Sequence, residues 1–283
     1  MKLILIMIFA LALSASAVAC GGGNDSSGSR KTVVASFYPL AFAAEQVGGE
    51  AVSVENLTPP GAEPHDLEVS PSDVSKIKSA DLVLLLGQGF QPQLEDAAGS
   101  GPEVMALLDT PALDLHPDGD PHVWLDPIRY MKIVERLGVV LGRPAAASRL
   151  LVRLRKLDRE YRRGLADCPR REIVTSHEAF AYLTERYGLH QIAITGLNPE
   201  AEPTPQALQE TVDVVRASHA TTVYFERLVS PRLAETVARE TGTKTAVLDP
   251  IEGLTDTEKN EGGDYFTLMR ANLRALQTGL GCR

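Results

Sequence analysis

The sequence predicts an α/β fold with two lobes, each a roughly four-stranded parallel sheet flanked by helices, and one long rigid helix that joins them. Three observations support this prediction. Short apolar strand patterns alternate with helical patterns, as they do in βα units. The same order of patterns occurs twice along the chain of 283 residues. Between the two copies lies a segment rich in strong helix formers.

The first halves of the two copies match segment by segment. Residues 32–49, "TVVASFYPLAFAAEQVGG", resemble residues 172–188, "EIVTSHEAFAYLTERYG". Each has a β-branched run, a serine and an amphipathic segment that ends at glycine. Residues 52–64, "VSVENLTPPGAEP", correspond to residues 192–203, "IAITGLNPEAEP". Both of these predict a strand that is followed by a proline-rich loop.

The second halves continue the same plan. Helical patterns begin at Ser70 and Thr204, each a hydroxyl N-cap followed by proline at the first helical position. The apolar runs "DLVLLLG" and "TTVYFE" come next, and further helical segments follow them. Each copy closes with a short strand that reaches an aspartate, which is Asp109 in the first and Asp249 in the second. The repeated plan therefore indicates one small α/β lobe per copy.

The segment between the copies predicts the joining helix. From Pro144 to Ala166 the chain has no internal proline and only one glycine. A single helix of that length would extend about 30 Å or more, which is enough to bridge two lobes. We therefore expect an N-terminal lobe over 31–143, a connecting helix over 144–167 and a C-terminal lobe over 168–283. A surface helix that belongs to one lobe is the alternative.

The N-terminus has the features of an exported lipoprotein. Lys2 precedes the apolar run "LILIMIFALAL", which is shorter than the roughly 18 residues expected of a membrane span. The small residues "ASAVAC" lead to Cys20 and resemble the lipobox of bacterial lipoproteins, whose cysteine is lipidated. We expect a signal peptide over 1–19, then the lipidated Cys20 and a flexible tether over 20–30. The protein is thus expected outside the cytoplasm, held at the cell membrane by its lipid.

Charge and cysteine content narrow the class of protein further. The formal net charge of −9 argues against binding to nucleic acid, because phosphate binding needs a basic face. Besides Cys20, the chain has two cysteines, Cys168 and Cys282. In an exported protein such a pair more often forms a disulfide than not, although the spacing alone does not prove that the two are close.

Polar side chains at the carboxyl ends of the predicted strands are the candidate binding residues, because loops and helix N-termini converge there. His177 directly follows "EIVTS". His65 lies after the second strand pattern, and His122 lies after the fourth, between two Asp-Pro turns. Asp249 ends the fourth strand pattern of the second copy. These four residues are candidate ligands of one metal ion.

The candidates also have ordinary structural interpretations. His122 could be a loop histidine that a backbone carbonyl satisfies. Asp249 precedes proline, as turn and helix-cap residues commonly do. The histidines, however, are not part of the repeated plan, since Phe37 stands in the first copy where His177 stands in the second. Histidines added to a shared scaffold indicate function, with chance substitution as the alternative.

Five motifs resemble those of the zinc-binding members of the metal-ion substrate-binding proteins of ABC transporters. In chain order they are "EPHDLEVSPSDV", "GDPHVWLDP", "SHEAFAYLTERYGL", "GLNPEAEPTPQAL" and "AVLDPIEGL". The resemblance runs from about Thr32 to the C-terminus. It implies two four-stranded lobes joined by a rigid helix, with one metal ion in the cleft between them. Matched motif by motif, the implied ligands are His65, His122, His177 and Asp249.

The resemblance also implies a function and partners. It implies high-affinity capture of extracytoplasmic zinc, Zn²⁺ being the transported ligand and not a catalytic cofactor. The ion would be delivered for uptake to a membrane-embedded ABC permease with its ATPase. We expect the chain to act as a monomer and not as an enzyme.

Three other functions stay open. One is a manganese- or iron-binding relative of the same class, although manganese-binding members usually carry glutamate at the position of His177. A zinc-dependent hydrolase is the second, but "HEAFA" ends at Ala181, where a zincin helix needs its second histidine. The third is a structural or adhesive lipoprotein that a metal stabilises.

The long histidine-rich loop of many zinc-binding members is replaced here by "ALDLHPDGD", with His116 alone.

Overall fold

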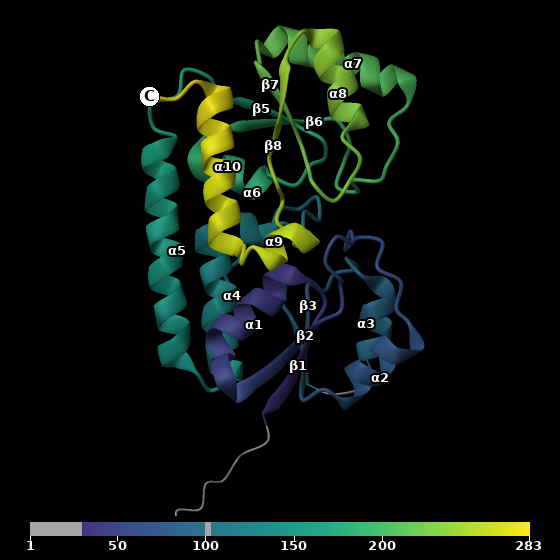
Figure 1. The fold of residues 1–283 in the computed structure, drawn as a ribbon, viewed down its shortest axis with the longest axis vertical. Helices are drawn as coiled ribbons and strands as arrows, with labels where there is room; N and C mark the ends of the chain where they lie inside the picture. The colour runs from purple at the N-terminus through teal and green to yellow at the C-terminus, as the bar shows by residue number, and fades with distance from the viewer. Residues whose placement is uncertain (1–29, 100–102) are drawn as a thin grey trace, which may run out of the picture.

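The computed structural model describes residues 30–99 and 103–283 and shows two α/β lobes stacked end to end (Figure 1). The expected signal peptide, Cys20 and most of the expected tether lie outside the described residues. Within the described residues, no helix combines the length and the apolar character that a membrane span requires.

Each lobe contains one parallel sheet of four strands, and the two sheets have the same strand order. The order is β2-β1-β3-β4 in the N-terminal lobe and β6-β5-β7-β8 in the C-terminal lobe. The predicted fold class is therefore confirmed. The strands are β1 (Lys31–Ala35), β2 (Val52–Asn56), β3 (Leu82–Leu85), β4 (Glu103–Ala106), β5 (Glu172–Thr175), β6 (His190–Ala193), β7 (Thr222–Phe225) and β8 (Lys244–Val247).

The central strands are apolar because helices cover both faces of each sheet. In the N-terminal lobe, all four residues of β3 are buried. The register places Val33 of β1 beside Leu82, and the equivalent contact in the C-terminal lobe pairs Val174 with Val223. Continuous burial of β-branched and leucine side chains explains why these strands appear in the sequence as unbroken apolar runs.

Helices begin where the sequence predicts capping residues. The Ser70 hydroxyl accepts a hydrogen bond from the Asp73 backbone N–H, and Thr204 accepts one from Ala207 in the same way. Proline follows each cap at the first helical position. The α-helices are α1 (Tyr38–Gly48), α2 (Pro71–Ser79), α3 (Pro92–Ala98), α4 (Pro127–Val140), α5 (Pro144–Gly164), α6 (Ala181–Tyr187), α7 (Pro205–Ser218), α8 (Arg232–Thr241), α9 (Asp256–Asn260) and α10 (Tyr265–Leu280).

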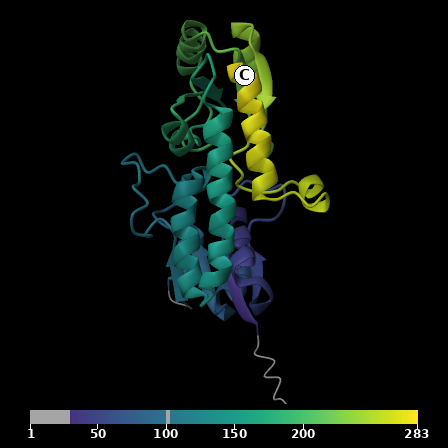
Figure 2. The ribbon, with the colours of Figure 1, turned by 90° about the vertical axis from the view of Figure 1, so that its left-hand side faces the viewer.

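Helix α5 is the joining helix, and it runs along both lobes (Figures 1 and 2). Its 21 residues extend about 30 Å. Its apolar face packs on α1 and α4 in one lobe and on α10 in the other. Near its C-terminal end, Tyr161 stacks on Tyr187 of α6 with ring centroids 5.0 Å apart. Burial of the same helix in both lobes resists their relative movement.

A disulfide joins Cys168 to Cys282 in the structure. Cys168 follows α5, and Cys282 lies just beyond α10, so the bond closes a loop over a sequence separation of 114 residues. The carbonyl of Asp167 also accepts a hydrogen bond from the terminal Arg283 N–H at 3.3 Å. The end of the chain is therefore held against the joining helix.

We predict that removing this disulfide lowers the free energy of unfolding by about 2–5 kcal/mol, because the unfolded chain regains the entropy of a long loop. The variant for the test is Cys168→Ser with Cys282→Ser, compared with the parent by denaturant unfolding. Thiol counting on the denatured, unreduced parent is the control. Two reactive thiols among residues 168–283 would contradict the pairing.

Candidate metal centre

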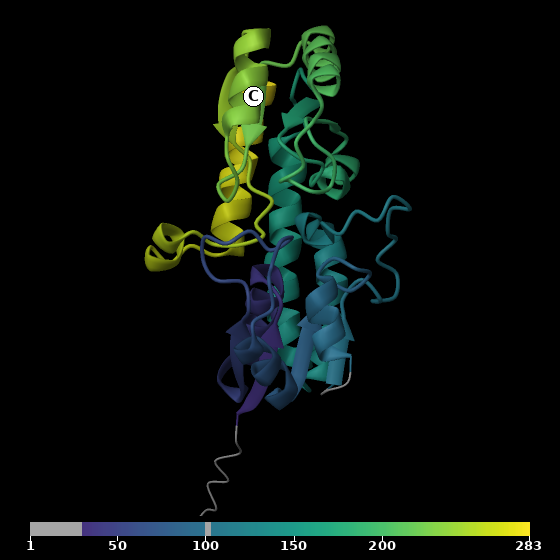
Figure 3. The same ribbon diagram turned by 90° about the vertical axis from the view of Figure 1, so that its right-hand side faces the viewer.

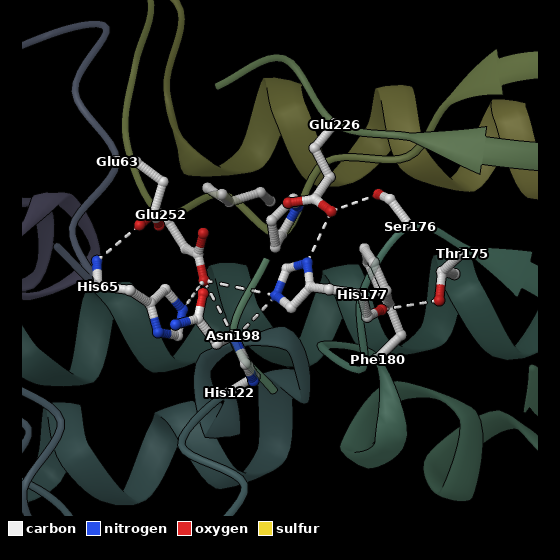
Figure 4. A network of polar contacts seen from close by, with 12 residues as sticks. Glu63, His65, His122, Thr175, Ser176, His177, Phe180, Asn198, Glu226 and Glu252 are labelled. Atoms are coloured by element: carbon white, nitrogen blue, oxygen red, sulfur yellow. Dashed lines mark hydrogen bonds and ion pairs between the residues drawn. The ribbon is translucent and has the colours of Figure 1, made fainter. Parts of the chain in front are cut away.

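Three histidines and one glutamate converge at the waist of the molecule, between the lobes (Figure 4). They are His65, His122, His177 and Glu252, and each offers one ligand atom within 4.8 Å of all the others. His65 is partly buried, whereas the other three are almost completely removed from solvent. The structure thus brings together all three histidines that the sequence predicts as ligands.

Each lobe contributes two of the four side chains from segments that follow its strands. His65 follows β2, and His122 lies between β4 and the 3-10 turn η2 (Val123–Leu125). His177 comes directly after β5, and Glu252 lies beyond β8. The carboxyl ends of parallel strands meet at one edge of each sheet, and these two edges face each other.

The ligand atoms are arranged around a single point. Glu252 Oε1 lies 3.1 Å from His65 Nε2 and 3.0 Å from His122 Nε2. The same oxygen is 4.0 Å from His177 Nε2. The Nε2 atoms of His122 and His177 are 3.4 Å apart. Three imidazole nitrogens and one carboxylate oxygen match the ligands that tetrahedral zinc takes in proteins.

Buried carboxylates orient two of the imidazole rings. The Nδ1–H of His122 donates to Asp120 Oδ1 at 2.7 Å, and that of His177 donates to Glu226 Oε1 at 2.6 Å. The Ser176 hydroxyl donates to the same Glu226 oxygen. A proton on Nδ1 leaves Nε2 as the metal-binding atom, which is the usual arrangement of histidine ligands and their outer partners.

Burial is the largest single influence on the charges of the cluster, but the hydrogen bonds and neighbouring charges together outweigh it. Burial opposes ionisation of Glu252, but hydrogen bonds from His122 and His65 hold the pKa of its carboxyl well below its usual range. Burial also opposes a charge on His122, yet hydrogen bonds to Asp120 and Glu252 raise its pKa to about 9. The metal-free cluster therefore holds a proton that a metal ion must displace.

Glu63, two residues before His65, has a raised pKa, whereas that of Glu252 is lowered. Burial, and next the charge of Glu252, raise the pKa of Glu63 to about 9. Glu63 Oε2 accepts a hydrogen bond from the backbone N–H of His65 at 2.9 Å. The His65 ring packs edge-on against Phe90, with ring centroids 4.6 Å apart. Contacts within its own lobe thus help to hold the loop that carries His65, and the loop is also bonded to the C-terminal lobe, where the Leu254 carbonyl accepts from the Gly61 N–H at 2.9 Å.

The structure brings Glu252, and not Asp249, to the three histidines. Asp249 Oδ2 accepts a hydrogen bond from Arg227 Nε at 2.7 Å, and its Oδ1 accepts one from the Ile251 N–H at 2.6 Å. Ile251 has a φ of 60°, which is unusual for a β-branched residue. This turn directs the side chain of Glu252 into the cluster. Asp249 therefore has the turn-forming role that its position before proline also suggested.

A cavity of about 200 Å³ lies beside His65. Phe90, Pro121 and Asn198 are among the residues that line it, so both lobes contribute to its wall. His122 and His177 are fully buried, whereas the His65 side chain is 11% exposed. His65 is therefore the histidine of the cluster that is in contact with the cavity.

His116 lies outside the cluster. Its ring stacks on Tyr182 with centroids 4.1 Å apart, and its Nε2 is 3.2 Å from Glu185 Oε2. The loop that contains it projects from the waist on the side opposite α9 (Figures 2 and 3).

Comparison with known proteins places the chain in a family. A family model described as zinc-uptake complex component A, periplasmic, matches residues 33–279. The zinc-binding lipoprotein AdcA of Streptococcus pneumoniae is 34% identical over 301 aligned residues, which cover 96% of this chain and 60% of AdcA. The chain thus spans about 60% of the length of that relative. The high-affinity zinc uptake system protein ZnuA of Bacillus subtilis is 31% identical, with 93% of each chain covered.

Solved structures agree with this placement. The Zn(II)-bound ZnuA-like domain of S. pneumoniae AdcA superposes with a TM-score of 0.76 at 34% identity, over 89% of this chain and 99% of that one. The laminin-binding protein Lmb of Streptococcus agalactiae, described as an adhesin with metal-transporting activity, gives 0.80 at 30% identity, over 88% and 99%. The chain belongs to the zinc-uptake complex component A family.

Proposed function

We propose that this protein captures zinc outside the cytoplasm at the site formed by His65, His122, His177 and Glu252, and delivers it to an ABC permease with its ATPase. The observation that carries the proposal is the convergence of three Nε2 atoms and one carboxylate oxygen within 4.8 Å of one another, from both lobes. Since one chain supplies all four ligands, a monomer suffices for capture.

The chemistry of the ligands favours zinc over manganese. Zinc readily takes nitrogen ligands in a tetrahedral site, whereas manganese prefers more oxygen ligands. His177 supplies the third nitrogen, and its ring is held by a hydrogen bond of 2.6 Å from Nδ1 to Glu226 Oε1. Four protein ligands also fill a tetrahedral site, so no position is left for the activated water that a hydrolase needs.

Metal titration of the chelator-treated protein tests the proposal. We expect one zinc ion per chain, bound at least about a hundredfold more tightly than manganese, with a ligand set of three nitrogens and one oxygen. The protein should stay folded after chelation, as a carrier must, and circular dichroism measures this. Tighter binding of manganese, or unfolding on chelation, would overturn the proposal.

Zinc affinity is predicted to fall with acidification. The pKa of His122 is raised to about 9 in the metal-free cluster, so zinc displaces a proton from this ring at neutral pH. For each pH unit below the pKa of His122, the apparent affinity for zinc should fall by up to about tenfold. Calorimetry between about pH 6 and pH 8, in buffers of different ionisation enthalpy, measures both the affinity and the proton release. An affinity that is constant over this range would contradict the prediction.

We further propose that the protein is anchored to the cell membrane by lipid at Cys20. The small residues before Cys20 support this, as does the similarity to AdcA, which is named a lipoprotein. A single acyl chain binds membranes only marginally, so we expect more than one. Mass spectrometry of the mature N-terminus should show an acylated Cys20, and cleavage elsewhere would refute the anchor.

A further inference from the structure

Helix α6 of the C-terminal lobe contacts the segment of the N-terminal lobe that carries His122. The helix begins at Ala181, four residues after His177. Two of its side chains, Tyr182 and Arg186, reach across the boundary between the lobes. The element that follows one proposed ligand therefore holds the loop of another.

Arg186 makes a bidentate ion pair with Asp126. Its Nε lies 2.8 Å from Asp126 Oδ1, and its Nη2 lies 2.6 Å from Oδ2. Asp126 is fully buried, and it caps α4 by accepting a hydrogen bond from the Ile128 N–H at 2.8 Å. Arg129 Nη1 donates to the same carboxylate at 2.8 Å. Two guanidinium groups, one from each lobe, thus share one buried carboxylate, which is a strong and geometrically specific contact.

Tyr182 connects α6 to the His122 ring through a single residue. Its hydroxyl donates to the backbone carbonyl of Asp120 at 3.0 Å and accepts from the His116 N–H at 3.0 Å. Asp120 in turn accepts hydrogen bonds from both the backbone N–H and the Nδ1–H of His122. The orientation of this ring therefore depends on a contact with the opposite lobe.

The two contacts flank His122 in the sequence. Asp120 lies two residues before it and Asp126 four residues after it, and both are held by α6. We call these four residues, Tyr182, Arg186, Asp120 and Asp126, the interlobe clasp. None of them is among the proposed ligands, so the clasp can form with or without a bound ion.

We propose that Arg186 and Tyr182 are positioning residues, which hold His122 beside His177 before the ion arrives and slow its departure. The proposal rests on the proposed metal site. The clasp sets the 3.4 Å separation of the two Nε2 atoms, so capture does not require the lobes to be brought together. His65 and Glu252 lie outside the clasp, and the ion enters and leaves on their side. Opening of the clasp separates His122 from His177 and thereby speeds release of the ion.

Arg186→Met is the main variant for the test, and zinc exchange measured by stopped flow with a chelator is the readout. We expect zinc dissociation to accelerate at least about tenfold, with the association rate changed less than about threefold, since interface changes act mostly on dissociation. Tyr182→Phe keeps the ring and loses only the hydroxyl, so a smaller acceleration is expected. Arg186→Lys keeps the charge without the bidentate geometry and should recover part of the effect.

Arg162→Met is the matched control. Arg162 also pairs with a buried aspartate, with its Nε 2.9 Å from Asp158 Oδ2, but both residues belong to α5. The Arg162→Met variant should leave the rates of zinc exchange unchanged. A purely stabilising role for Arg186 predicts that both arginine variants lower thermal stability while zinc dissociation stays at the parental rate. That result would overturn the proposal.

A second readout separates this proposal from the proposed function. Spin labels on exposed residues of α2 and α7 report the distance between the lobes in the metal-free protein. Arg186→Met should broaden that distance distribution, whereas Arg162→Met should not. If the parent binds no zinc but Arg186→Met still broadens the distribution, the clasp stands and the metal site fails. An unchanged distribution in Arg186→Met refutes the clasp.

Discussion

His122→Ala is expected to weaken zinc binding at least about a hundredfold, or about 2.8 kcal/mol, while the protein remains folded. Loss of a residue that only orients a metal ligand commonly lowers metal affinity by about 10–100-fold. Loss of the ligand itself should lower it further. His122 is fully buried, and its Nε2 lies within 3.4 Å of both Glu252 Oε1 and His177 Nε2. Calorimetric titration with zinc measures the change.

His116→Ala is the matched control for this variant. His116 belongs to the same segment of the chain, but it stacks on Tyr182 outside the cluster. Its loss should change zinc affinity less than about threefold, since it provides no ligand atom. If His122→Ala bound zinc as tightly as the parent, or if both variants lost it equally, the proposed site would be wrong.

Glu252→Ala is expected to have an effect of similar size, and comparison with Asp249→Ala decides which carboxylate is the ligand. Removing Glu252 takes away the one proposed oxygen ligand and a negative charge that would offset the charge of the ion. We expect zinc affinity to fall at least about a hundredfold. Glu252→Gln, which keeps the volume and loses the charge, should retain more affinity than the alanine variant.

Asp249→Ala should instead act on the turn. It removes the acceptor for Arg227 and for the Ile251 N–H, so it is expected to lower the free energy of unfolding by about 1–3 kcal/mol. Its effect on zinc affinity should be smaller than that of Glu252→Ala. Zinc titration and denaturant unfolding of both variants give the answer. The reverse order of zinc affinities would restore Asp249 as the ligand.

The fold was largely predictable because its signals are local. Alternating strand and helix patterns follow from burial on one face of a helix or on both faces of a strand, and the structure confirms four strands in each of two sheets. The caps at Ser70 and Thr204 depend only on neighbouring backbone N–H groups. The repeat indicated one lobe per copy, and the structure shows that the two sheets have the same strand order.

The three histidines were predictable for a topological reason. In parallel sheets, the residues that follow the strands converge at one edge, and His65, His122 and His177 all follow strands. The two carboxylates that orient the imidazole rings were less visible. Asp120 and Glu226 bind the Nδ1 atoms of two ligands, but in the sequence they are ordinary loop carboxylates.

The choice between Asp249 and Glu252 needed the tertiary structure. Both are carboxylates in one short segment after β8, so residue type and spacing do not separate them. The turn at Ile251, which has a positive φ, directs Glu252 into the cluster. Asp249 instead accepts a hydrogen bond from Arg227. The motif "AVLDPIEGL" contains both residues, but the sequence predicted only Asp249 as a ligand, and the backbone geometry shows that Glu252 faces the cluster.

The sequence by itself determined the two parallel sheets, the long joining helix and the three candidate histidines, because periodicity, capping and strand ends are properties of short segments. Only the tertiary structure decided the fourth side chain and the clasp between Arg186 and Asp126, 60 residues apart in the chain. Those contacts join two lobes, and their formation depends on how α5 and α6 set one lobe against the other. A contact between distant segments is selected by the packing of the whole chain, and no local pattern records it.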